Sequence, residues 1–162
     1  MNEQSLKIAI DCDDAAIEFK DIIYNYLKSK GQDVVDLKYA QEMNATYPEI
    51  GYNLAVKVGN KEFDRGILLC GTGLGMAIIA NKVEGVYAGV CHDVYSAERL
   101  RKSNNAQILT MGARVIGAEL AKKIVDAWLA SEFEGNRSMP KVEKIQLLEY
   151  QSFHKEAHLC KK

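Results

Sequence analysis

One segment indicates the architecture of the whole chain: Gly66-Ile67-Leu68-Leu69-Cys70-Gly71-Thr72-Gly73-Leu74-Gly75. Residues 67–69 are apolar without alternation, which predicts a strand buried on both faces of a sheet. Three glycines fall within the five residues 71–75, so the backbone can turn sharply and approach a ligand closely. A helical pattern follows through residues 76–82. The segment therefore predicts a strand–turn–helix unit of a parallel α/β sheet.

The cysteine of this segment lies where α/β proteins bind ligands. Open α/β sheets bind them beside the carboxyl ends of the strands, and Cys70 ends its predicted strand. The start of the following helix favours an anion, and the same field favours the thiolate of Cys70. A lone cysteine at a strand end is otherwise a small buried hydrophobe, and the residues alone leave both interpretations open. The pattern is neither a Walker A loop nor a clear dinucleotide-binding fingerprint.

The composition fits one domain, residues 1–162, with 48% hydrophobic and 27% charged residues. A net charge of −1 gives no electrostatic case for binding nucleic acid or an anionic membrane. The sequence contains no apolar run long enough to span a membrane, and residues 1–5 do not resemble a signal peptide. The cysteines form no Cys-x-x-Cys pair, which predicts reduced thiols in a cytoplasmic protein and neither a disulfide framework nor a zinc site. They stand at positions 12, 70, 91 and 160.

Predicted strands and helices alternate along the chain. The strands are expected at residues 6–10, 33–37, 66–70, 86–91 and 106–111. The helices are expected at residues 15–30, 50–58, 76–84, 95–102, 117–133 and about 141–158, with Thr46 and Glu49 as a capping box. This alternation predicts an α/β fold: a three-layer, Rossmann-like sandwich with a five-stranded parallel sheet and an extra C-terminal helix. No strand follows that last helix, so it packs either on a partner subunit or on its own sheet.

Several polar residues are expected to converge at the carboxyl edge of this sheet: Asp13, Cys70, Thr72, His92 and Asn104. Together with their neighbours, they make the chain resemble the ribose-5-phosphate isomerase type B family, which also includes the galactose-6-phosphate isomerase subunits. The resemblance runs from Lys7 to about Gln151. It rests on Ile10-Asp11-Cys12-Asp13, Thr46-Tyr47-Pro48, Leu69-Cys70-Gly71-Thr72-Gly73-Leu74-Gly75, Ala80-Asn81-Lys82, Tyr95-Ser96-Ala97, Asn104-Asn105, Gly112-Ala113-Arg114-Val115-Ile116-Gly117 and Glu134-Gly135-Asn136-Arg137.

The resemblance implies an aldose–ketose isomerase of phosphorylated sugars that uses no metal and no cofactor. In that family a base moves a proton between C1 and C2 through a cis-enediolate, and Cys70 matches that base. Thr72 and the loop amides would stabilise the enediolate oxygen, while Asp13 and Asn104 would hold substrate hydroxyls. The phosphate would be held by Arg137 and Lys141, with Arg114 as a further candidate. The remaining expected substrate-binding residues are Asp14, Tyr47, Gly71, Gly73, Gly75, Ser103 and His92.

Family members are dimers or tetramers whose site is shared between subunits. The resemblance therefore implies a homodimer or homotetramer with its active site at the subunit interface, and the extra C-terminal helix agrees with this. Its implied partner is a small phosphorylated sugar.

This chain departs from the family at three histidines. Asp14 stands where a histidine follows the Cys-Asp pair, and Ser103 stands where the ring-opening histidine precedes the asparagine. Ser138 replaces the histidine after Arg137, and Lys141 replaces an arginine. His92, at the end of the fourth predicted strand, either supplies the missing acid or is structural.

The default substrate pair is ribose 5-phosphate and ribulose 5-phosphate, and erythrulose 4-phosphate is a close rival. A tetrose 4-phosphate cannot close into a ring, because its C4 oxygen carries the phosphate. An enzyme acting on it needs no ring-opening acid, so the missing histidines favour weak use of ribose 5-phosphate relative to a tetrulose phosphate. Two further alternatives are a binding subunit of a galactose-6-phosphate isomerase and a flavodoxin-like or nucleotide-binding module. The intact Cys70 loop argues against the binding subunit.

Overall fold

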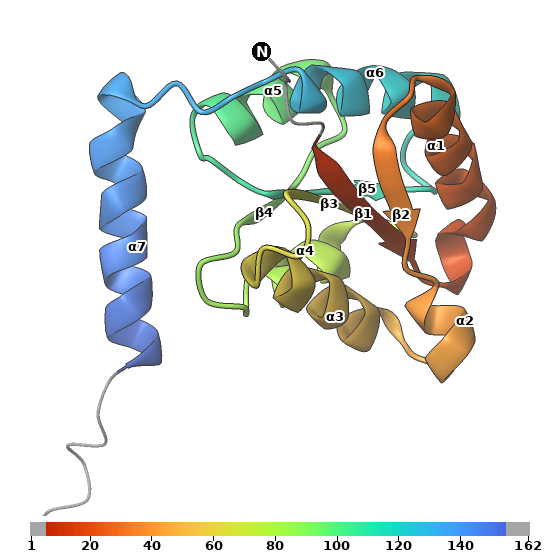
Figure 1. Ribbon diagram of the computed structural model, residues 1–162, viewed down its shortest axis with the longest axis horizontal. Coiled ribbons are helices and arrows are strands. Elements are labelled where there is room, and N and C mark those ends of the chain that lie inside the picture. The colour runs from red at the N-terminus through yellow and green to blue at the C-terminus, as the bar shows by residue number, and fades with distance from the viewer. Residues whose placement is uncertain (1–5, 155–162) are drawn as a thin grey trace, which may run out of the picture.

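The computed structural model describes residues 6–154 and contains a five-stranded parallel sheet (Figure 1). The strand order is β2-β1-β3-β5-β4. The strands are β1 (Lys7–Cys12), β2 (Asp33–Asp36), β3 (Arg65–Cys70), β4 (Ala88–Val90) and β5 (Ile108–Gly112). The sheet confirms the predicted α/β class, and β3, the predicted doubly buried strand, lies at its centre.

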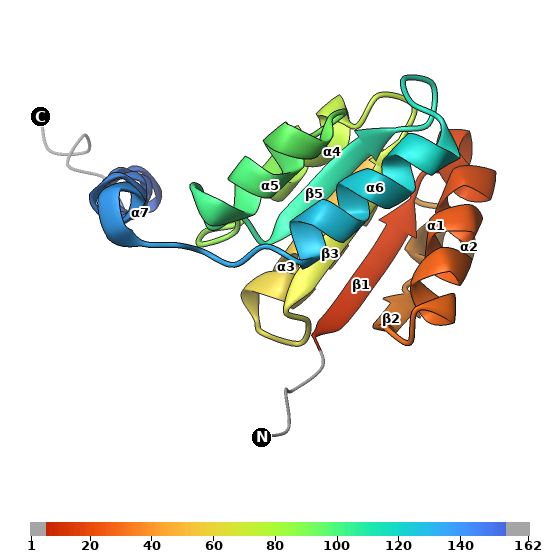
Figure 2. The ribbon, with the colours of Figure 1, turned by 90° about the horizontal axis from the view of Figure 1, so that it is seen from above.

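Helices cover both faces of the sheet and make a three-layer sandwich (Figure 2). Apolar side chains of α1 (Ile17–Ser29), α5 (Val94–Lys102) and α6 (Ala118–Leu129) pack with one set of strand residues. Those of α3 (Tyr47–Gly59) and α4 (Leu74–Ala80) pack with the alternate set. Because strand side chains alternate between faces, Ile67 and Leu69 face the first layer, while Leu68 and Cys70 face the second.

Some element boundaries differ from the prediction. The predicted first helix begins as a short 3-10 turn, η1 (Asp14–Ala16), and the segment before the capping box contains α2 (Tyr39–Met43), which was expected to be a loop. The capping box itself is formed as predicted, with Thr46 N donating to Glu49 Oε2 at 2.7 Å. β4 is shorter than predicted, because Val86 N bonds to Val83 O in a turn and Tyr87 N bonds to the Gln107 side chain.

The last helix, α7 (Met139–Phe153), follows the short 3-10 turn η2 (Asn136–Ser138) and stands beside the sheet (Figure 1). Its Glu149 Oε2 accepts bonds from Tyr87 Oη at 2.7 Å and Gly85 N at 3.2 Å, next to β4. Within residues 6–154, neither hydrophobic cluster of the sheet includes a residue of α7. The alternative in which α7 covers its own sheet is therefore wrong. The predicted extension to residue 158 lies outside the described residues, as do His158 and Cys160.

Within residues 6–154, no helix has both the length and the apolar character that crossing a membrane requires.

Candidate active site

Cys70 is held at the carboxyl end of β3 with its sulfur in the mouth of the glycine-rich turn. Its Sγ accepts a hydrogen bond from Gly73 N at 3.0 Å. The side chain is 6% exposed and borders a cleft in the surface. The Gly73 N–H therefore fixes the position of the sulfur at the edge of this cleft.

The turn packs against the end of β5 and is hydrogen-bonded to it. Ala113 N donates to Cys70 O at 2.9 Å, and the Thr110 hydroxyl donates to Gly73 O at 2.9 Å. Gly73 has a φ of +79°, and a Cβ there would approach Met111 C to 2.9 Å. Since both the backbone conformation and the space exclude a side chain, the packing of β5 fixes the Gly73 N–H against the thiol.

The cleft beside the thiol has a volume of about 440 Å³ and combines acidic, basic and aromatic groups. Arg114 packs against Gly71, where an added Cβ would lie 3.4 Å from Arg114 Nη1. The Thr72 hydroxyl oxygen accepts a bond from Leu74 N at 3.3 Å, which leaves its proton free to be donated. The lining residues are Asp13, Asp14, Ala15, Tyr47, Cys70, Gly71, Thr72, Gly75 and Arg114.

Asp13 lies at the junction of β1 and the first helical turn. Its Oδ1 accepts a bond from Ala15 N at 3.0 Å, as an N-cap does. Burial raises the pKa of Asp13, and the nearby charge of Asp14 raises it further. The Ala15 N–H and the Arg114 guanidinium oppose this rise. Asp13 therefore lies at the rim of the cleft with one oxygen bonded to the Ala15 N–H, where its carboxyl oxygens can accept bonds from hydroxyl groups.

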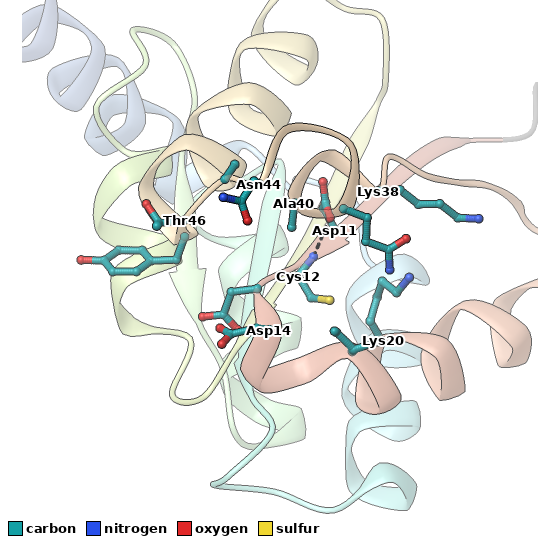
Figure 3. Close-up of a pocket in the computed structure, with 13 residues that line it drawn as sticks. Asp11, Cys12, Asp14, Lys20, Lys38, Ala40, Asn44 and Thr46 are labelled. Atoms are coloured by element: carbon teal, nitrogen blue, oxygen red, sulfur yellow. Dashed lines mark hydrogen bonds between the residues drawn. The ribbon is translucent and has the colours of Figure 1, made fainter.

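A second, larger cavity of about 660 Å³ (Figure 3) shares the lining residues Asp13, Asp14 and Tyr47 with this cleft. It lies between α2 and the start of α1, and its lining includes Cys12 but not Cys70. Asp11 in its wall accepts bonds from Cys12 N at 2.8 Å and Tyr39 N at 3.1 Å. Burial raises the pKa of Asp11 from 3.8 to about 6.

The sequence reasoning did not single out this cavity or two polar residues in its wall. Lys20 lies on the inner face of α1 and pairs with Asp36 at the end of β2, while Asp11 is buried within β1. The sequence pattern could have indicated both residues as buried polar groups. Asp11 is two residues after buried Ala9 on the same face of its strand, and Lys20 occupies a position of its helix that the apolar periodicity assigns to the core. Within residues 6–154, no group of three or more His, Cys, Asp or Glu is arranged to hold a metal ion.

Four of the predicted site residues lie away from the thiol cleft: Ser103, Asn104, Arg137 and Lys141. α5 leaves the carboxyl end of β4 and returns across the sheet to the start of β5, so Ser103 and Asn104 lie at the amino edge. This differs from the expectation for Asn104. The segment before Arg137 and Lys141 also contacts this region, where Glu134 N donates to Lys102 O at 3.2 Å. Figure 2 shows α7 on the side away from the arrowheads of β1 and β5.

Comparison with known proteins gives a consistent result. Residues 8–145 match the family model described as Ribose/Galactose Isomerase. The chain belongs to this family.

The ribose/galactose isomerases similar to this chain include several with named activities. A D-erythrulose-4-phosphate isomerase of Pectobacterium atrosepticum is 55% identical over 150 residues, covering 92% of this chain and 99% of that protein. A ribose-5-P isomerase B of Listeria innocua is 48% identical over 141 residues, covering 87% and 95%. The solved structure of Clostridium thermocellum ribose-5-phosphate isomerase B has a TM-score of 0.86 and 42% identity, covering 91% and 99% of the two chains. This chain is a sugar-phosphate isomerase of the same fold.

The structure also shows the surroundings of Ser103 and Asp14, which stand where the ribose enzymes have histidines, and of His92. Arg99 Nε donates to Ser103 Oγ at 2.9 Å. Asp14 is exposed at the shared rim of the two cavities. His92 lies at the end of β4, where its Nε2 accepts a bond from Gly112 N at 2.9 Å.

Proposed function

We propose that this isomerase interconverts an aldose phosphate and its ketose phosphate with Cys70 as the proton-transfer base. The observation that carries the proposal is the thiol that accepts the Gly73 N–H beside a cleft lined by Thr72, Asp13 and Arg114. Positioned bases of this kind contribute about 10²–10⁴-fold to a rate.

The reaction balances without any added reactant. The Cys70 thiolate removes a proton from C1 of the ketose, which gives a neutral thiol and a cis-enediolate whose O2 carries the charge. Thr72 donates its hydroxyl proton as a hydrogen bond to that oxygen, in the manner of an oxyanion hole. The O1 proton then passes to O2, the thiol returns its proton to C2, and the aldehyde forms at C1. Asp13 orients the substrate hydroxyls and Arg114 faces the anionic end of the sugar.

We further propose that the preferred substrate is an open-chain tetrulose 4-phosphate of the D-erythrulose type. Such a sugar cannot form a ring through its C4 oxygen, so no acid is required at Ser103 or Asp14. Three observations support this: Ser103 accepts a bond from Arg99, His92 Nε2 accepts a bond from Gly112 N, and two relatives are named for this activity. Interconversion of ribose 5-phosphate and ribulose 5-phosphate is the second candidate, favoured by the Listeria relative and the solved structures.

The site is proposed to be completed by a second copy of the chain. Arg114 lies in the thiol cleft, whereas Ser103, Asn104, Arg137 and Lys141 lie on the far side of the fold. A two-fold oligomer can bring the amino-edge group of one copy to the thiol cleft of the other. α7 agrees with this, because it stands beside its own sheet and exposes apolar residues, including Ile145 and Leu148.

The decisive experiment assays the purified chain on D-erythrulose 4-phosphate, D-ribulose 5-phosphate and D-tagatose 6-phosphate. The proposal expects the highest kcat/KM for the tetrulose phosphate. It also expects solvent deuterium to enter the product in D₂O, since the carbon-bound proton passes through a thiol. Cys70→Ala should lower kcat by at least about 10²-fold with little change in KM.

Cys91→Ala is the matched control, because Cys91 is another buried thiol at a strand end but faces the hydrophobic core. It should keep near-normal kcat. Normal turnover in Cys70→Ala would remove the proposed base. Equal or higher kcat/KM for ribulose 5-phosphate would replace the tetrulose assignment with the second candidate.

A further inference from the structure

Where β4 ends, a side chain accepts a hydrogen bond from β5 in place of a backbone carbonyl of β4. Cys91 N donates to Thr110 O at 3.1 Å, which continues the ladder one residue past Val90. The chain then turns into α5, whose first turn is capped by Asp93. The next N–H of β5, at Gly112, donates to His92 Nε2 at 2.9 Å. The imidazole thus adds one hydrogen bond to the sheet where the backbone of β4 has left it.

Gly112 lies directly beneath the thiol turn. It pairs with Cys70 in the β3–β5 register. A Cβ added to Gly112 would lie 2.6 Å from Thr72 Cα and 2.8 Å from Thr72 O, so the two backbones are in tight contact. The neighbouring N–H of Ala113 bonds to Cys70 O at 2.9 Å. Any displacement of Gly112 is therefore passed to both Thr72 and Cys70.

We propose that His92 is a positioning residue for the Cys70–Gly73 turn, acting as a neutral imidazole that carries its proton on Nδ1. A ring nitrogen that accepts an N–H bond holds no proton of its own. Nε2 is therefore not the acid that opens a sugar ring, and a protonated imidazole would present an N–H to the Gly112 N–H. The proposal rests on the proposed function only in using turnover at Cys70 as one of its measurements.

Two titratable groups, Asp93 and Cys91, flank the imidazole on its own segment. The pKa of Asp93 is lowered, chiefly by its hydrogen bonds with Ser96 and slightly by His92. Burial raises the pKa of the preceding Cys91 to about 12, which keeps that thiol neutral. From β5, the contact is the Gly112 backbone.

The test compares His92→Ala with His92→Gln. Alanine leaves the Gly112 N–H without an acceptor. Glutamine places its Oε1 about as far from the backbone as Nε2, and it accepts the bond without titrating. We expect His92→Ala to lose at least about tenfold in kcat with a smaller change in KM. We expect His92→Gln to recover most of that loss in kcat.

A matched control and a second substrate exclude other roles. His154→Gln removes an exposed imidazole that pairs with Glu84 and should leave kcat unchanged. His92→Ala should lose the same factor on D-erythrulose 4-phosphate, which is always open-chain, as on D-ribose 5-phosphate, which forms a ring. A loss confined to ribose 5-phosphate, or a glutamine variant no better than alanine, would overturn the proposal.

Two measurements on the protein do not depend on its substrate. The ring-nitrogen shifts of His92 in a ¹⁵N correlation spectrum should be those of the Nδ1–H tautomer. Iodoacetamide should modify Cys70 at a rate that changes in His92→Ala and returns in His92→Gln. An Nε2–H tautomer, or identical alkylation rates in all three proteins, would overturn the positioning role. Both readouts remain decisive if Cys70→Ala keeps its turnover, and the tautomer is decisive even if His92→Ala does not fold.

Discussion

At the scale of single residues, the free cysteines in the described part of the chain differ in what surrounds the sulfur. Burial raises the pKa of Cys12 and of Cys91 to about 12 each. The three side chains are similarly buried, so access does not separate them. Of these three described cysteines, Cys70 alone accepts a backbone N–H bond at its sulfur, from Gly73. The three thiols therefore differ in the groups that surround the sulfur.

This contrast predicts the order of alkylation. At mildly alkaline pH, iodoacetamide should modify Cys70 faster than Cys12 or Cys91, because only a thiolate reacts. Peptide mapping by mass spectrometry would give the three rates. A saturating sugar phosphate should slow the reaction at Cys70 and leave the other two unchanged. Equal rates at Cys12 and Cys70 would contradict the assignment of Cys70 as the activated thiol.

Asp11 predicts a pH effect on stability. Burial raises its folded pKa from 3.8 to about 6, with smaller opposing contributions from the N–H groups of Cys12 and Tyr39. Between these two values the folded protein holds a proton that the unfolded chain has released. The contribution of Asp11 to stability therefore falls as pH rises from about 4 to 6 and stays low above that range.

Asp11→Asn cannot titrate, so its unfolding free energy relative to wild type should rise by up to about 3 kcal/mol between about pH 4 and pH 7. Urea unfolding at the two pH values measures this difference. Asp33→Asn, at an exposed position on β2, is the control and should show a much smaller change. A difference for Asp11→Asn that is the same at both pH values would contradict the prediction.

At the scale of elements, the turn between β3 and α4 is shaped by its neighbour β5. Gly73 and Gly31 have almost the same φ, at +79° and +75°. Gly31 ends α1 in open space, whereas the Cα of Gly73 faces the backbone of Met111. Alanine substitution at these two glycines therefore separates two contributions to the unfolding free energy. One is the cost of a side chain at a positive φ, and the other is the cost of displacing a packed strand.

Gly31→Ala should cost about 1 kcal/mol of unfolding free energy through its positive φ and should keep full activity. Gly73→Ala should cost about 2–4 kcal/mol, because its Cβ also collides with β5. It should also lower kcat by at least about tenfold, since it displaces the N–H that bonds Cys70. Urea unfolding and initial rates measure both effects. Equal losses in the two variants would show that β5 does not constrain the turn.

At the scale of the whole molecule, the predicted site residues form two groups at opposite edges of the sheet. The thiol group includes Cys70 and Arg114, while Arg137 and Lys141 lie near the amino edge. Within one chain the two groups lie apart. An oligomer in which each site takes one group from each copy predicts complementation between variants.

Cys70→Ala and Arg137→Ala, produced together in one cell, should recover about a quarter of wild-type activity, because mixed dimers contain one intact site. Assays at low substrate keep the Arg137→Ala background small, since its KM is expected to rise. Cys70→Ala with Thr72→Ala is the control and should recover nothing, because both changes fall on the same edge. No recovery in the first pair would contradict a shared site.

The sequence by itself determined what depends on neighbours along the chain. The apolar run 67–69, the glycines after Cys70 and the capping box at Thr46 and Glu49 are local, so strand, turn and helix start could all be predicted from residue order. The tertiary structure decided what depends on strand order and on where helices end. Asn104 is displaced from the expected edge because α5 runs back across the sheet. His92 meets Gly112 because β4 and β5 are neighbours in the order β2-β1-β3-β5-β4. Hydrophobic periodicity specifies which face of an element is buried but not which element lies beside it, so these contacts required the folded chain.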